Sequence, residues 1–282
     1  MKSIENRAFM TLHCHYKVST ILAMSKQRLS RFSIFALTLI STATLAVCQE
    51  DGDFGAPRLE EPDWLENYYL DPTPEQFVEK MREYSQDGTL VNEEARGALV
   101  GFISQLIRQN RDKIDDWYTA LSGLTPEEKQ VLHTAMLFSH TEESKAILKL
   151  EFDEKFETEK EELPKILELK LDEVRTLDML WGFFYATGSE NAIRRIIACF
   201  QFADTKVDPN SAKIPEGYSP LSEQLPEAAA WSLKSNAIRH EKVKDICFKL
   251  YGEKKTLSPT EKSLLREKVL SGFLPEDTPE GQ

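Results

Sequence analysis

Histidines are the first residues to weigh for chemistry, because imidazole binds metal ions and transfers protons near neutral pH. The triplet His13-Cys14-His15 has metal-binding composition, but a closed zinc site takes about four ligands and no others follow it closely. His133 and His140 lack the four-residue spacing that places two imidazoles on one metal, and His240 in HEKVK lacks the second histidine of a zinc-protease motif. We therefore expect no metal or other cofactor, and interpret the last three histidines as helix-capping or surface residues.

Catalytic motifs of other kinds are missing from the sequence. It contains no G-x-x-x-x-G-K or G-x-G-x-x-G phosphate loop and no G-x-S-x-G nucleophile elbow. With 47 Asp and Glu residues, adjacent carboxylates carry no information, and DEKFETEKEE lacks the glycine-centred spacing of a calcium loop. The sequence predicts no catalytic activity; a hydrolase whose site is assembled from scattered acids is the alternative.

Two cysteines, Cys199 and Cys247, lie in the body of the chain. In an exported protein they could form a disulfide if their Cα atoms approach within about 7 Å. Alternatively, each is a small hydrophobic residue of the core.

The tryptophans Trp181 and Trp231 lie about 50 residues apart, each within an apolar helical pattern. We interpret them as core residues that fill space between helices. The functional alternative is that both line a groove for a peptide, an apolar ligand or a partner protein.

A short apolar run, residues 33–47, follows Lys26, Arg28 and Arg31. It is shorter than the roughly 20 residues that span a bilayer, and its positive flank and small residues are typical of a secretory signal peptide. Counting from Met24 gives a signal of ordinary length. The sequence thus predicts a leader at 1–48, made of an upstream extension (1–23) and a signal peptide (24–48).

Three fates are open for this leader. Simple cleavage gives a periplasmic or secreted protein, and an uncleaved leader gives a membrane anchor. The stretch LAVC, ending at Cys48, resembles a bacterial lipobox, although Val47 departs from the usual small residue. Lipidation of Cys48 would give a membrane-anchored lipoprotein.

The charge of the chain limits its partners. The net charge of the 282 residues is −12, and removing the leader leaves 29 Lys and Arg against 46 Asp and Glu. Such an acidic chain repels nucleic acid and anionic lipid, so membrane contact is expected only through the leader or a lipid at Cys48. We expect an unknown protein partner, and an acidic surface would favour a basic or polar one.

Helix signals dominate the rest of the chain. Helix starts are predicted at Thr73, Asn92, Thr125, Ser189 and Ser258. Gly97 and Gly101 weaken one helix unless they allow close helix contact. The sequence predicts a single all-helical domain at 62–272 with a charged or extended break near 151–175, a flexible acidic spacer at 49–61 and a disordered tail at 273–282.

Three stretches, near Leu132, Leu180 and Ala230, share one pattern at a spacing of 48–50 residues. Each has an apolar helix, a polar turn and an amphipathic helix. This predicts an all-α fold of antiparallel hairpins stacked as a right-handed, αα-solenoid-like array, with a compact helical bundle as the alternative.

The expected function combines export with helical hairpins. We expect an exported, helical-repeat-like binding or scaffold protein of the bacterial cell envelope. A lipid-anchored envelope structural protein is the alternative besides the hydrolase.

Overall fold

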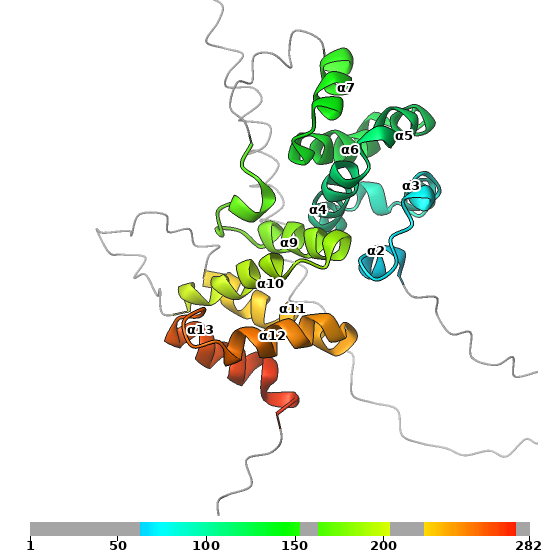
Figure 1. Cartoon of the computed structure of the whole chain (residues 1–282). Helices are drawn as coiled ribbons and strands as arrows, with labels where there is room; N and C mark the ends of the chain where they lie inside the picture. The colour runs from blue at the N-terminus through cyan, green and yellow to red at the C-terminus, as the bar shows by residue number, and fades with distance from the viewer. Residues whose placement is uncertain (1–62, 153–162, 204–222, 275–282) are drawn as a thin grey trace, which may run out of the picture. The chain divides into compact units, whose positions relative to one another are not determined.

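The computed structural model describes residues 63–152, 163–203 and 223–274 (Figure 1). These residues belong to one compact unit, Glu60–Gln282. They form helices and no strand, which confirms the all-α fold class. The leader with Cys48, the spacer at 49–61 and residues 275–282 of the tail lie outside the described residues.

The first described range holds six α-helices, and a single turn of 3-10 helix precedes the second, the third and the fourth of them. The α-helices are α2 (Trp64–Asn67), α3 (Phe77–Gln86), α4 (Glu93–Gln109), α5 (Ile114–Ala120), α6 (Pro126–Ser139) and α7 (Glu142–Phe152). The 3-10 turns are η1 (Pro74–Gln76), η2 (Thr89–Val91) and η3 (Arg111–Lys113).

The second and third ranges hold five more α-helices. They are α9 (Val174–Thr187), α10 (Glu190–Ile197), α11 (Leu225–Arg239), α12 (Glu241–Gly252) and α13 (Pro259–Leu264). The shorter elements are η4 (Ile166–Glu168), η5 (Ala198–Phe202), the π-helical turn η7 (Leu265–Val269) and η8 (Leu270–Gly272).

Four of the five predicted helix starts are confirmed with a side-chain cap. Asn92 and Ser189 accept a backbone hydrogen bond at the starts of α4 and α10, and Thr125 and Ser258 form capping boxes. The helical segment also starts at Thr73 with Pro74 in its first turn, as predicted, but it begins as the 3-10 turn η1 that leads into α3. The predicted side-chain cap is absent, and the Thr73 hydroxyl instead accepts a hydrogen bond from the Trp64 indole (2.9 Å).

The capping box of α6 allows a direct test of local helix stability. We expect Thr125→Ala to lower the free energy of unfolding by about 1 kcal/mol, because the Glu128 amide loses its acceptor. Thr125→Ser keeps the hydroxyl and should stay within about 0.5 kcal/mol of the wild type. Urea denaturation followed by circular dichroism measures both. Equal losses in the two variants would contradict a capping role.

The three predicted helical hairpins are present as α6–α7, α9–α10 and α11–α12. Their turns pass through His140 and Gly188, both in the left-handed region (φ 54° and 61°), and through the extended residue His240. The solenoid-like array itself is not confirmed. In a solenoid each repeat contacts only its neighbours, whereas here α4 packs on α9, and Tyr69 meets His240.

The helices α4 and α9 cross very closely, and glycines make this possible. A Cβ atom at Gly101 would lie 2.1 Å from the Met179 carbonyl oxygen, and one at Gly182 would lie 2.0 Å from that of Ala98. A Cβ at Gly97 would lie 2.7 Å from the Asp178 Cβ. The expectation that glycines in this helix allow close contact is confirmed.

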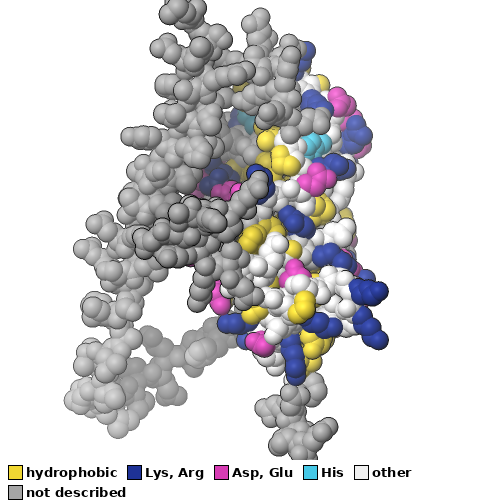
Figure 2. Space-filling model, turned by 90° about the vertical axis from the view of Figure 1, so that its left-hand side faces the viewer, with side chains coloured by type: hydrophobic (Ala, Val, Ile, Leu, Met, Phe, Trp, Pro, Cys, Tyr) yellow, Lys and Arg dark blue, Asp and Glu magenta, His cyan; other side chains and the backbone are white. Residues whose placement is uncertain are grey.

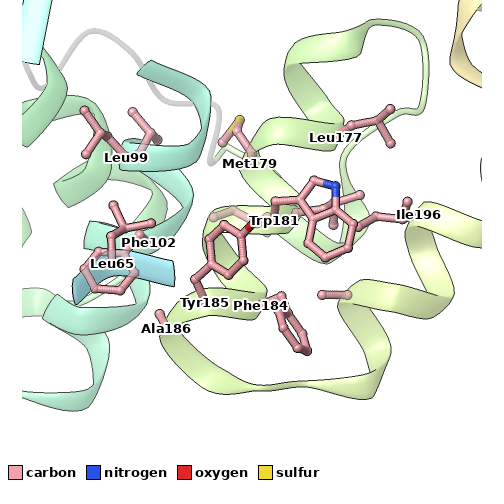
Figure 3. Close-up of a cluster of buried hydrophobic side chains, with 14 of the residues drawn as sticks. Leu65, Leu99, Phe102, Leu177, Met179, Trp181, Phe184, Tyr185, Ala186 and Ile196 are labelled. Carbon is pink, nitrogen blue, oxygen red and sulfur yellow. The ribbon is translucent and has the colours of Figure 1, made fainter. Parts of the chain in front are cut away.

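Aromatic side chains of α9 fill the core beside this crossing (Figure 3). Trp181 stacks on Tyr185 with ring centroids 5.9 Å apart, and Phe184 meets the edge of both rings. Phe102 from α4 and Leu65 from α2 belong to the same buried cluster. The prediction that Trp181 is a core residue is confirmed by its exposure of 5%.

The predicted break near 151–175 lies between the end of α7 at Phe152 and the start of α9 at Val174. Its first part, residues 153–162, lies outside the described residues. The following stretch makes one 3-10 turn, η4, against α9 and α10. Ile166 and Leu171 are buried, and the Arg195 guanidinium donates a hydrogen bond to the Leu169 carbonyl, so this stretch is held on the helices.

Candidate functional site: the outer face of α11

The helix α11 carries the most exposed aromatic side chain among the described residues. Its start is marked by Pro226 in the first turn, where a missing N–H is tolerated, and by Glu227, whose charge suits a helix N-terminus. Ala228, Ala229 and Ala230 favour the helix without selecting a face. Arg239 stands in the last turn, before His240 ends the helix.

One face of α11 is fully packed. Leu225, Ala229 and Leu233 are 0% exposed and follow each other at four-residue steps, and Ala237 continues the series at 2%. This face contacts α9, α10, α12, η5 and η7. The backbone of α11 is therefore held in place from within.

The opposite face bears a line of exposed side chains, which we name the α11 stripe: Glu227, Trp231, Lys234 and Ile238. Their spacing of four, three and four residues places them on one side of the helix. Trp231 is 75% exposed and Ile238 is 67% exposed. The interpretation of Trp231 as a core residue is therefore wrong. Because Trp181 is buried, only Trp231 of the predicted pair offers its ring to a ligand.

A pocket opens beside the N-terminal half of the stripe. Its volume is about 200 Å³, and it is lined by Phe200, Ala203, Glu223, Pro226, Glu227, Ala230, Leu264 and Lys268. A water molecule takes up about 30 Å³ in the liquid, so the pocket can hold one large side chain. Its walls are apolar, and Glu223, Glu227 and Lys268 supply charge. The stripe and this pocket together form what we call the α11 face.

The helices around this face are not acidic, unlike the chain as a whole. Residues 223–274 contain ten Lys and Arg against seven Asp and Glu. Figure 2 shows several Lys and Arg side chains over the lower part of the face that it draws. The expectation of an acidic surface that favours basic partners does not extend to this region.

A polar cluster fixes the C-terminal end of α11. The Arg239 guanidinium donates to both carboxylate oxygens of Glu66 in α2, at 2.7 and 2.5 Å. The Tyr185 hydroxyl donates to Asn236 at 2.8 Å, and Arg239 also reaches this Asn oxygen at 3.3 Å. Partners from α2 and α9 thus hold the last turn of α11.

His240 joins this cluster and is buried, with 3% exposure. Its Nδ1 lies 3.3 Å from the Tyr69 hydroxyl, and its Nε2 lies 3.7 Å from a Glu66 oxygen, beyond hydrogen-bond length. The interpretation as a surface residue is wrong for His240. It ends α11 and starts α12 through its backbone, without a side-chain cap.

The pKa of Glu66 is lowered by neighbouring His240 and by Arg239, against the opposing effect of partial burial. We attribute most of this to Arg239, whose contacts have hydrogen-bond length. A carboxylate with a lowered folded-state pKa stabilises the fold above its unfolded pKa, and this contribution is lost as the pH falls through the folded pKa.

A pH series with Glu66→Gln tests this pair. Near neutral pH we expect the variant to be less stable by about 1 kcal/mol, a small value because Arg239 is about half exposed. The difference should stay constant down to about pH 5 and shrink below about pH 4, under the ordinary glutamate pKa. Urea denaturation at each pH provides the measurement. A difference that persists unchanged at pH 2 would contradict the assignment.

The other two histidines of the body, His133 and His140, lie within and at the end of α6. His133 Nε2 lies 3.0 Å from the Tyr118 hydroxyl, and burial lowers the pKa of this histidine. His140 ends α6 in the left-handed conformation, so its role as a helix C-cap is confirmed. Within the described ranges no cluster of His, Cys, Asp and Glu could hold a metal ion.

Cys199 and Cys247 are both free thiols with 0% exposure. Burial raises the pKa of each thiol to about 12, so both stay protonated at neutral pH. Their interpretation as core residues is confirmed. A disulfide between them is not formed in this structure and stays a prediction for the exported protein.

No helix in the described part of the chain is both long and apolar enough to cross a bilayer.

In comparisons with known proteins, no family model, no curated protein and no solved structure matched this chain.

Proposed function

We propose that this chain is an exported binding or scaffold protein of the bacterial cell envelope, and that it contacts its partner through the α11 face. The observation that carries the proposal is the exposure of Trp231 on a helix whose other face is fully packed. Tryptophan is one of the residue types enriched among the side chains that contribute most to binding at protein interfaces. A helix held from within also loses little freedom on binding, which favours affinity.

A protein partner suits this surface better than a nucleic acid. The stripe presents two apolar side chains with a single lysine between them and an acid at its start. Phosphate recognition needs several unopposed cations in a row, whereas apolar contacts framed by single charges are typical of protein interfaces.

Export is the second part of the proposal and depends on the leader. Its positive flank and short apolar run support a periplasmic or secreted location, with a lipoprotein anchored at Cys48 as the alternative. The N-terminal sequence of the protein isolated from its natural compartment distinguishes these fates. A start at Gln49 or Val47 supports simple cleavage, and a blocked, lipidated Cys48 supports the anchor. An intact Met1 or Met24 in the cytosol would contradict export.

Affinity capture from envelope extracts tests the binding role. The wild type should retain a partner protein that Trp231→Ser loses, and both should unfold at nearly the same urea concentration because Trp231 is 75% exposed. Leu150→Ser is the matched control, since Leu150 is 87% exposed on α7. It should retain the partner. Equal capture by wild type and Trp231→Ser would contradict the α11 face as the binding surface.

A further inference from the structure

We propose that a second copy of this chain docks on the α11 face, with the two α11 helices antiparallel and crossing at Trp231. This inference rests on the proposed function, because it names a partner for the same surface. A twofold axis through Trp231 would stack the two indole rings, each 75% exposed in the single chain. Such a symmetric interface requires a patch that is complementary to itself.

The charges of the α11 stripe meet this requirement. Glu227 precedes Trp231 by four residues and Lys234 follows it by three, which is about 6 Å and 4.5 Å along the helix axis. The twofold axis therefore brings Glu227 of each copy opposite Lys234 of the other. The contact of Glu227 with Lys268 uses Oε1 at 3.3 Å and is exposed, so Oε2 can accept from the second copy.

The shape of the α11 face is complementary to itself as well. Ile238 follows Trp231 by two turns and is 67% exposed. The pocket walls formed by Glu223, Pro226 and Glu227 lie one to two turns before Trp231. In the antiparallel pair, Ile238 of each copy therefore faces the pocket of the other copy.

This pattern favours a second copy over an anionic lipid surface. Lipid headgroups of one charge sign would attract Lys234 but repel Glu227, whereas a second copy satisfies both. Because the contact spans only a few helical turns and each processed copy has 29 Lys and Arg against 46 Asp and Glu, a net charge of −17, we expect a weak dimer in the micromolar range.

Sedimentation of the processed protein over a concentration series tests the pairing. The wild type should be a dimer at high concentration, and Trp231→Ser should dimerise at least about 30-fold more weakly. Glu227→Lys and Lys234→Glu should each weaken the dimer about tenfold, because each variant places like charges together. An equimolar mixture of these two variants should restore dimers, since the mixed pair again places Lys opposite Glu.

The mixing experiment distinguishes this antiparallel pairing from dimers that use another interface. Circular dichroism should show that all variants keep the wild-type helix content. A wild type that stays monomeric at several hundred micromolar, or a mixture that dimerises no better than its components, would overturn the self-pairing. If Trp231→Ser still loses a captured partner in that case, the proposed function stands with a different partner.

Discussion

Gly182→Ala is expected to destabilise the fold by about 3 kcal/mol or more, since its methyl group would lie 2.0 Å from the Ala98 carbonyl oxygen and 2.7 Å from the Phe102 amide. Both obstacles are backbone atoms of α4, so no change of side-chain rotamer can relieve the clash. The helices α4 and α9 would have to separate, which would also loosen the aromatic core beside the crossing. Urea denaturation measures the loss, and Gly101→Ala should behave alike.

The matched control for the helix crossing is Gly252→Ala at the end of α12. A Cβ atom there meets nothing within 4 Å. We expect this variant to be neutral or more stable by up to about 1 kcal/mol, because alanine favours helix more than glycine. If Gly182→Ala and Gly252→Ala changed stability equally, the close packing of α4 on α9 would be refuted.

The two tryptophans provide the second large contrast. Trp181→Ala should lower the free energy of unfolding by about 3–5 kcal/mol, because it leaves a cavity among Phe184, Tyr185 and their neighbours. Trp231→Ala should change it by less than about 0.5 kcal/mol, because the side chain is mostly in solvent. Fluorescence offers a second readout: loss of the exposed Trp231 should shift the total tryptophan emission of the protein to shorter wavelength.

Chemical denaturation of both variants side by side provides the measurement. Which variant loses more stability matters more than the size of either loss, since both variants remove the same side chain from a helix. A larger loss in Trp231→Ala than in Trp181→Ala would contradict the burial of Trp181 and remove the basis for the α11 face.

Local signals explain why most helices could be predicted. A helix cap depends on residues within one turn, so Asn92, Thr125 and Ser258 were sufficient to place their helices. At Thr73 the start was placed correctly but the side-chain cap was not, because the hydroxyl accepts instead from the Trp64 indole, nine residues earlier. The spacing of the hairpins was also visible, whereas the stacking of the hairpins depends on contacts between distant residues.

The candidate site could be predicted only in part. Trp231 was singled out from the sequence, but its side of the helix was misjudged because the three preceding alanines suit either face. The signal that could have placed it is the series Leu225, Ala229 and Leu233, which marks the opposite face as the inner one. The contact of Glu66 with Arg239 joins residues 173 apart, a separation that spacing rules cannot bridge.

Photo-crosslinking at position 231 in the cells that make this protein tests the central claim most directly. A photoreactive amino acid replaces Trp231 in one strain and Glu241 in another; Glu241 is a suitable control because its side chain is 82% exposed on α12. If the α11 face is the interaction surface, irradiation should yield a defined protein adduct, either a second copy or another partner, at position 231 and much less at 241. No adduct at 231, or equal yields at the two positions, would contradict the account.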